Sequence, residues 1–200
     1  MSNNILIDTF RKRRTQYSLG RHLPVPQEQV ESVIKDAVRL SPSAFNSQSS
    51  RIVILFGAES GKLWNIAKDA LRKIVPVDAF AQTEARLDGF SAGAGTILFY
   101  EDQATIKGLQ GNFASYAEHF PIWSEHASGM AQFAVWSALA DINIGASLQH
   151  YNPLIDAEVA KTWGISSDWK LRAQMPFGSN ESPFPEKTYV EDSVRFRVYG

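Results

Sequence analysis

Two short apolar runs place the strongest constraint on how this chain folds. Ile52–Phe56 and Thr96–Tyr100 consist almost entirely of β-branched, aliphatic and aromatic residues. Uninterrupted apolar runs of this kind are typical of strands that are buried in a sheet. Trp169–Met175 instead alternates apolar and polar residues, which is typical of a strand with one buried face. These three segments predict a sheet inside the protein.

Helical patterns surround the predicted strands. Pro26–Arg39 places Val30, Ile34 and Val38 on one face of a helix, and Pro26 suits the start of that helix. Further helices are expected at about residues 5–11, 61–74, 78–90, 102–117, 124–144 and 153–163. The chain has no internal repeat and no low-complexity linker, so its 200 residues fit a single domain, residues 1–200.

The charge balance and the missing cysteines exclude several classes of protein. Lys and Arg number 20 against 21 Asp and Glu, so the net charge of −1 does not indicate binding to nucleic acid or to an anionic membrane surface. The absence of cysteine excludes disulfides, thiolate catalysis and cysteine-ligated metals. Because no apolar signal core and no membrane-spanning run is found, we expect a soluble cytoplasmic protein.

The loop Leu40–Ser50 lies between a predicted helix and the first predicted strand. Pro42 ends the helix and biases Ser41 toward extended conformations. The loop then presents amides, hydroxyls and backbone N–H groups at the edge of the sheet, where they would cradle a planar polar ligand. An ordinary connection between a helix and a strand explains the same residues, and by themselves they favour that simpler interpretation.

A compact basic cluster, Arg-Lys-Arg-Arg, lies near the N-terminus. Arg13 and Arg14, followed by the hydroxyl of Thr15, are suited to binding a phosphate through bidentate guanidinium bonds and one hydroxyl bond. A second cationic group, Lys187 or Arg195, would complete such a clamp. A solvated helix face is the alternative interpretation of the cluster.

Two apolar segments predict contacts that one chain alone does not explain. The helix predicted at 124–144 carries few charges after Glu125, so we expect it to be buried on most sides. Such burial indicates either a helix packed against a partner subunit or the central helix of a monomer. The segment 194–199 alternates like a strand but has no neighbouring element, and it would gain most by pairing with a sheet edge of its own chain or of a partner.

Several catalytic and nucleotide-binding patterns are missing. Gly93-Ala-Gly95 precedes a strand and opens no helix, so it is not a dinucleotide fingerprint. His119 and His126 lack a third metal ligand, and no serine nucleophile elbow stands out. We therefore expect neither a metal site nor a catalytic side chain, and a bound cofactor becomes the natural carrier of the chemistry.

Six motifs, taken in order, resemble the nitroreductase family of FMN-dependent oxidoreductases over nearly the whole chain. The motifs are Arg13–Thr15, Ser41–Gln48, Gly95–Asp102, Phe120–Glu125, Gly145–Asn152 and Met175–Gly178. Each motif is weak alone, and their common order makes the resemblance specific. The similarity is greatest to the small branch that includes the fungal fatty-acid-repression-mutant protein and bacterial nitroreductases of about this size.

The resemblance implies an α+β, nitroreductase-like fold with a central mixed sheet flanked by helices. It also implies an intertwined homodimer in which the subunits share a long helical interface and a C-terminal strand reaches the partner. Two FMN sites would lie at the subunit interface, with NADH or NADPH as the electron donor. The acceptors would be nitroaromatics, quinones or similar flat, electron-poor molecules.

The resemblance further implies which residues bind FMN. Arg13 and Thr15, assisted by Lys187, would hold the phosphate and the ribityl chain. Gln149 and His150 would line the isoalloxazine, and a backbone N–H of their loop would lie near flavin N5 and O4. The remaining expected contacts are Arg14, Tyr17, Pro42, Ser43, Ala44, Asn46 and Gln48. Of these, the residues at 42–46 would come from the other subunit.

The substrate pocket and two departures from the family pattern complete the comparison. Phe45, Phe120 and Trp123 are the expected pocket walls, and plain core packing is the alternative for each. Tyr17 stands where the family often has Lys or Arg near the flavin pyrimidine, and the loop reads Gln-Ser-Ser-Arg at 48–51 where many members have Gln-Pro-Trp. The missing cation would weaken stabilisation of the anionic reduced flavin unless Arg51 or Arg86 replaces it.

The resulting hypothesis is an FMN-dependent NAD(P)H oxidoreductase that works by ping-pong hydride transfer through flavin N5. The alternative is a flavin-binding regulatory or stress-response protein with only incidental reductase turnover. Flavin destruction or dehalogenation on the same scaffold would need substrate-capturing insertions that the sequence does not contain.

Overall fold

The structure is a computed structural model that describes residues 4–200. Within this range the strands form one sheet in the order β1-β5-β3-β2, with β4 beside β5. The strands are β1 (Leu19–Gly20), β2 (Ser50–Phe56), β3 (Gly95–Asp102), β4 (Gly145–Ala146) and β5 (Trp169–Asn180). Every ladder between these strands is antiparallel, so the expectation of a mixed sheet is wrong although the α+β class is confirmed.

The connection between β2 and β3 explains why these strands are antiparallel. α3 (Gly57–Leu71) and α4 (Val77–Ser91) pack against each other as a pair, with Pro76 between them. A paired connection of this kind returns the chain to the end of the sheet from which it left, whereas a single crossover helix would deliver a parallel strand. The isolated bridge between Thr15 and Ala146 is a parallel contact outside the named strands.

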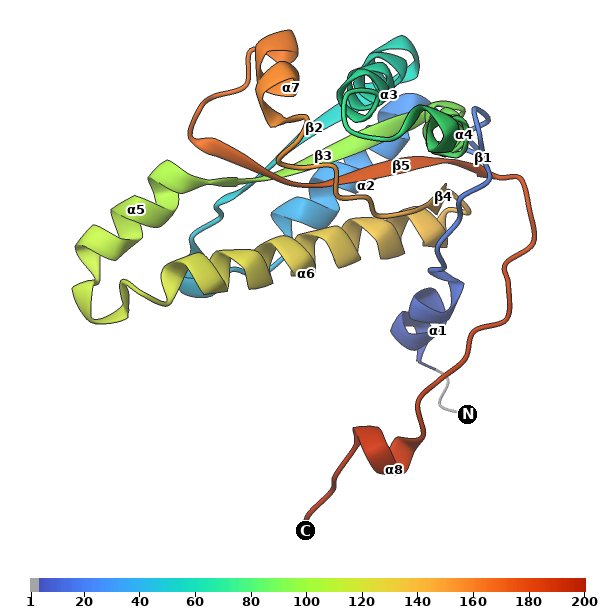
Figure 1. Cartoon of the computed structure of the whole chain (residues 1–200). Coiled ribbons are helices and arrows are strands. Elements are labelled where there is room, and N and C mark those ends of the chain that lie inside the picture. The colour runs from blue at the N-terminus through green and yellow to red at the C-terminus, as the bar shows by residue number, and fades with distance from the viewer. Residues whose placement is uncertain (1–3) are drawn as a thin grey trace.

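Helices cover both faces of the sheet (Figure 1). In addition to α3 and α4, they are α1 (Ile5–Lys12), α2 (Gln27–Arg39), α5 (Gln103–Asn112), α6 (Phe120–Asp141), α7 (Asp156–Trp163) and α8 (Asp192–Arg195). Short 3-10 turns occupy Ala44–Asn46 and Ala114–Tyr116. None of the helices within residues 4–200 is long and apolar enough to span a bilayer.

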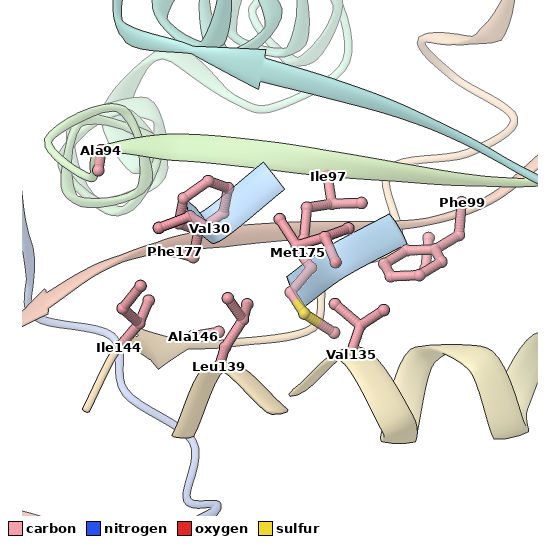
Figure 2. Close-up of a cluster of buried hydrophobic side chains, with 12 residues drawn as sticks. Val30, Ala94, Ile97, Phe99, Val135, Leu139, Ile144, Ala146, Met175 and Phe177 are labelled. Atoms are coloured by element: carbon pink, nitrogen blue, oxygen red, sulfur yellow. The ribbon is translucent and has the colours of Figure 1, made fainter. Parts of the chain in front are cut away.

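β3 is buried along its whole length and divides the core into two layers. Ile97 and Phe99 point to the layer that contains α2 and α6, where Met175 of β5 also packs (Figure 2). Leu98 and Tyr100 point to the layer of α3, α4 and α7. Alternate residues of one strand therefore serve both layers, as a period of two requires, and the uninterrupted apolar sequence of β3 follows from this position.

α6 begins earlier than the apolar pattern predicts. It starts at Phe120 with Pro121 in its first turn, a position where the missing N–H of proline breaks no helical bond. One face of the helix, which includes Val135 and Leu139, is buried against the sheet and α2. Met130 and Phe133 stay about 40% exposed, so within one chain the helix is not buried on most sides.

The C-terminal segment departs most from the sequence-based expectation. Within the described chain, Asp192–Arg195 is a short helix and residues 196–200 pair with no strand, so the segment does not add to the chain's own sheet. The expected C-terminal strand that reaches a partner stays a prediction. The segment instead extends away from the sheet (Figure 1), and Val198 and Tyr199 are 93% and 89% exposed.

Candidate functional site

The extended segment from Arg13 to Tyr17 follows α1 and lies along the sheet. The backbone N–H of Gln16 donates to the carbonyl of Ala146 at 2.9 Å, and the Gln16 side chain is only 3% exposed. In an extended segment alternate side chains point to opposite sides. The inward position of Gln16 therefore orients its neighbours Thr15 and Tyr17 to the other side.

Three cations and a hydroxyl meet in one cleft of about 290 Å³. The lining residues are Arg13, Arg14, Thr15, Pro185, Glu186, Lys187 and Thr188. The sequence-predicted clamp therefore gathers Lys187, whereas Arg195 does not line this cleft. Within residues 4–200 none of the three cations forms an ion pair with a carboxylate, which leaves their charge available to an anion.

Arg13 is held in place by an aromatic ring and by partial burial. Its guanidinium lies 4.6 Å from the centre of the Trp136 ring, a cation–π contact with α6. Burial and the neighbouring charge of Arg14 lower the pKa of Arg13. Both effects penalise an unpaired cation at this position, so a bound anion would stabilise it.

Hydrogen bonds of the Gln16 side chain join the segment of residues 13–17 to the segment after β5, next to this cleft. Its side-chain amide donates to the carbonyl of Ser182 at 2.8 Å and accepts from the Ser182 hydroxyl at 3.0 Å. Arg14 donates to the carbonyl of Pro185. Sequence reasoning missed Gln16, although its place between alternate polar residues of an extended segment was a usable signal.

A second cavity of about 550 Å³ lies where the same segment reaches Tyr17. It is lined by Tyr17, Gln82, Ala85, Arg86, Gly89, Phe90 and Gln149. We call it the Tyr17 cavity. It joins two predicted flavin contacts, Tyr17 and Gln149, with a face of α4.

The loop after β4 has an alternating set of backbone bonds. The N–H groups of Ser147 and Gln149 donate to carbonyls of β5, and the N–H of Tyr151 donates to the side chain of Gln174. Within residues 4–200 no such bond is made by the N–H of Leu148 or of His150. A backbone donor for a ligand would therefore come from Leu148 or His150, not from Gln149. The side chain of His150 is exposed and lines neither cavity.

The loop of residues 41–48 holds an unusual backbone. Phe45, Asn46 and Gln48 have φ angles of 55°, 50° and 47°, in the left-handed region that residues with a Cβ rarely adopt. Backbone strain of this kind is concentrated at functional sites. Pro42, Ser43 and Gln48 line a cavity of about 220 Å³, while Ala44 and Phe45 line another of about 350 Å³ with Trp123, His126 and Met130. Asn46 lines neither of them.

Buried polar groups fix the end of this loop. The carboxylate of Glu101, which is 0% exposed, accepts from the hydroxyls of Ser49 and Ser50 at 2.5 Å each. Arg51 donates to the carbonyl of Gln48 at 2.5 Å and pairs with Asp102 at 2.8 Å. These bonds hold the loop in its strained conformation.

The three aromatic residues predicted as pocket walls lie together. The ring of Phe45 lies 5.3 Å from Phe120 and 6.0 Å from Trp123, measured between centroids. Phe45 is 49% exposed, but Phe120 is only 2% exposed and is covered by the cluster. In this chain Phe45 and Trp123 form the surface, while Phe120 supports them from below as a core residue does.

The predicted site residues therefore fall into two groups. The cleft of Arg13 and the Tyr17 cavity form one group, and the loop of residues 41–48 with its aromatic cluster forms the other. None of the five cavities described for this chain is lined by residues of both groups. Within residues 4–200 no three His, Asp or Glu side chains gather as a metal site, and His119 instead stacks on Trp123 at 5.3 Å.

A family comparison matches most of the chain. The model of the nitroreductase family matches residues 10–179. The Saccharomyces cerevisiae protein HBN1 is 34% identical over 190 residues, which cover 94% of this chain and 94% of HBN1. The part that the family model matches includes both groups of predicted site residues except Lys187, which lies beyond residue 179.

Solved structures agree with this match. The nitroreductase CinD of Lactococcus lactis, in complex with chloramphenicol, is 50% identical and has a TM-score of 0.90 over 97% of this chain and 99% of CinD. CinD has also been solved with 4-nitrophenol and with nicotinic acid. A Desulfovibrio desulfuricans protein solved with FMN shares the fold at 14% identity, with a TM-score of 0.74 over 100% of this chain and 99% of that protein.

Proposed function

Because this chain belongs to the nitroreductase family, we propose that it is an FMN-dependent NAD(P)H oxidoreductase. Its acceptors would be nitroaromatics, quinones or similar flat, electron-poor molecules. The binding of chloramphenicol and 4-nitrophenol by CinD supports this choice of acceptor, and the FMN of the Desulfovibrio protein supports the choice of cofactor. We expect the protein in the cytoplasm, which cell fractionation would check.

The cleft of Arg13 is the observation that carries the proposal. Two guanidinium groups, an ammonium group and the hydroxyl of Thr15 line it, and the one carboxylate of the lining, Glu186, forms no ion pair with these cations within residues 4–200. Planar guanidinium groups bind phosphate oxygens in bidentate fashion, and ammonium and hydroxyl groups bind the remaining oxygens. The donor set therefore fits the phosphate of FMN.

The direction of the extended segment fits the rest of the cofactor. At about 3.3 Å per residue, the backbone covers roughly 13 Å between positions 13 and 17. The segment begins in the phosphate cleft and ends in the Tyr17 cavity. Arg13 and Thr15 would hold the phosphate and the ribityl chain, while Tyr17 and Gln149 would bind the edge of the ring.

A homodimer would bring the two groups of site residues together. One chain leaves apolar residues exposed on α1, α6 and the C-terminal segment, among them Ile5, Phe133 and Val198. Large exposed apolar patches mark interaction surfaces. In the proposed dimer the partner's loop of residues 42–46 covers the ring, and Phe45 and Trp123 line the acceptor site.

The bound flavin would supply the hydride chemistry, receiving hydride from the nicotinamide donor and passing it to the acceptor. The chain's own residues orient the ring and leave one of its faces accessible. A backbone N–H of Leu148 or His150 would donate to the ring where negative charge develops. Because donor and acceptor use the same face in turn, we expect ping-pong kinetics.

An anaerobic absorbance titration of the purified protein tests the proposal. Yellow protein that NADH or NADPH bleaches rapidly, and that recovers its colour with a nitroaromatic or a quinone, is the expected result. Yellow protein that resists both donors favours the flavin-binding regulatory alternative. Colourless protein that takes up no added FMN contradicts the proposal.

A further inference from the structure

A reduced flavin bound in the Tyr17 cavity would be stabilised by a nearby positive charge, and the side chain of Tyr17 carries none. A hydride carries two electrons and one proton, so its transfer to a neutral flavin leaves the ring with one negative charge while the nicotinamide donor becomes oxidised. A cation near the ring stabilises that charge in a low-dielectric site. The candidates along the neighbouring elements are Arg51 and Arg86.

The guanidinium of Arg51 is already bonded to other groups of the chain. Its guanidinium pairs with Asp102 at 2.8 Å and donates to the carbonyls of Gln48 and Ser50 at 2.5 Å and 3.2 Å. It lines the cavity beside Pro42 and Ser43, not the Tyr17 cavity. Its charge is therefore balanced by Asp102, and its bonds fix the end of the loop.

Arg86 has the opposite surroundings. Within residues 4–200 it forms no ion pair and no side-chain hydrogen bond, and it lines the Tyr17 cavity. The two neighbouring acids of α4 are occupied, because Asp88 pairs with Lys68 and Glu84 pairs with Arg72. Arg86 therefore presents an uncompensated charge to the cavity.

The face of α4 around Arg86 carries polar and small residues. Gln82, Ala85 and Gly89 follow helical spacing on that face and provide an amide and two small residues, while the ring of Phe90 is buried against Trp64 behind them. A Cβ built on Gly89 would lie 3.9 Å from the carbonyl oxygen of Tyr17, which shows how closely the helix faces the extended segment. A planar polar ring bound in the Tyr17 cavity, beside this close approach, would have the guanidinium of Arg86 at its edge.

We propose that Arg86 supplies the positive charge of the Tyr17 cavity and binds the reduced, negatively charged flavin more tightly than the oxidised one. Arg86 thus takes the role that the family often gives to a basic residue at the position of Tyr17. The inference rests on the proposed function, and it adds a residue on a different element that sets the redox potential of the cofactor.

The test compares FMN binding and midpoint potential in Arg86→Gln and in the parent protein. The dissociation constant of oxidised FMN should stay within about twofold, because the oxidised ring is neutral. The dissociation constant of reduced FMN should rise about tenfold, which lowers the midpoint potential by about 30 mV for two electrons. Binding is followed by flavin fluorescence, and the potential by equilibration with a reference dye.

Three further variants separate this role from general effects. Arg86→Lys should restore most of the potential, since it keeps the charge. Lys107→Gln removes one charge from the exposed side of α5 and should leave the potential unchanged. Arg51→Gln should leave the ratio of the two dissociation constants close to that of the parent.

The opposing outcomes are equally definite. An unchanged ratio of reduced to oxidised binding in Arg86→Gln overturns the inference while leaving the proposed function intact. A larger shift in Arg51→Gln than in Arg86→Gln assigns the charge to Arg51 and also overturns it. A parent protein that takes up no FMN overturns the inference and the proposed function together.

Discussion

Glu101 is a carboxyl group that the fold buries completely beneath the loop of residues 41–48. Burial raises the pKa of Glu101, although the hydroxyls of Ser49 and Ser50 and the charges of Arg172 and Arg51 act in the opposite direction. The folded chain therefore binds this proton more tightly than the unfolded chain does. Stability that is present below the unfolded pKa of about 4.3 is lost as pH rises through the folded pKa.

We predict that Glu101→Gln, which mimics the protonated group, removes this loss. Relative to the variant, the parent protein should lose stability as pH rises from about 4 to 8, by about 1.4 kcal/mol for each pKa unit of elevation. One kcal/mol corresponds to roughly 2–4 °C in Tm for a chain of this size. The Tm of parent and variant, measured by thermal unfolding across this pH range, tests the prediction, and Glu118→Gln at an exposed position is the control. Parallel curves for parent and Glu101→Gln would contradict the assignment.

Arg13 allows a test of the phosphate cleft at single-residue resolution. Arg13→Ala should weaken FMN binding by about 10- to 100-fold, since a charge-assisted bond contributes about 1.5–3 kcal/mol. Riboflavin has no phosphate, so its affinity should stay the same in parent and variant. Fluorescence titration with both flavins measures the difference, and Arg21→Ala is the matched control on an exposed arginine outside the cleft. A purified Arg13→Ala protein that retains stoichiometric FMN would refute the clamp.

For single residues, the sequence predicts which side chains have the chemistry of a site better than it predicts how deeply each side chain is buried. Arg13, Arg14, Thr15 and Lys187 were grouped by their chemistry, and in the structure they line one cleft. The burial of Phe120 was not predictable, because aromatic residues at helical spacing look alike whether they line a pocket or fill a core.

The loop of residues 41–48 is the element where local preference and structure disagree most. Gln48 is exposed yet has a φ of 47°, and a side chain in this region costs roughly 1–2 kcal/mol. Gln48→Gly should therefore be as stable as the parent or more stable, because relief of strain offsets the added chain entropy of glycine. Gln48→Val should lose about 1 kcal/mol or more. Urea unfolding of the three proteins measures both effects, and the reverse order would show that the loop is not strained.

Helices and strands with a clear hydrophobic periodicity were predicted well. The boundaries of the helices and the relative directions of the strands were not. The apolar runs at 52–56 and 96–100 lie inside β2 and β3, and the helix expected over 26–39 is α2. The antiparallel order was not predictable, since it depends on α3 and α4 packing as a pair. The helix expected at 124–144 begins four residues earlier, at Phe120, because a proline such as Pro121 is compatible with the first turn of a helix.

Within residues 4–200 of one chain, the C-terminal segment of residues 196–200 packs against no other element. Val198 and Val77 are 93% and 95% exposed, so a charge at either should have no effect on a monomer. If the partner covers the C-terminal segment, Val198→Glu should weaken the dimer by about 10- to 100-fold, because burial of a valine side chain contributes about 1.5–3 kcal/mol. Val77→Glu should leave the dimer unchanged.

Sedimentation velocity over a range of concentrations measures both association constants. Parent protein should sediment as a species of twice 22.3 kDa. Equal behaviour of the two variants would remove the C-terminal segment from the interface. The sequence alone did not decide this question, because an apolar helix and an orphan alternating segment are explained equally well by a partner and by the same chain.

The Arg13 cleft is lined by residues 13–15 and by residues 185–188, which lie about 170 positions apart in the sequence. During synthesis on the ribosome, the N-terminal arginines emerge long before the segment that completes the cleft. A chain that stalls or is cut before residue 187 would therefore fold much of its sheet yet lack a full anchor for the phosphate. Such a chain would bind FMN more weakly in the proposed site and would gain less of the stability that the bound cofactor confers.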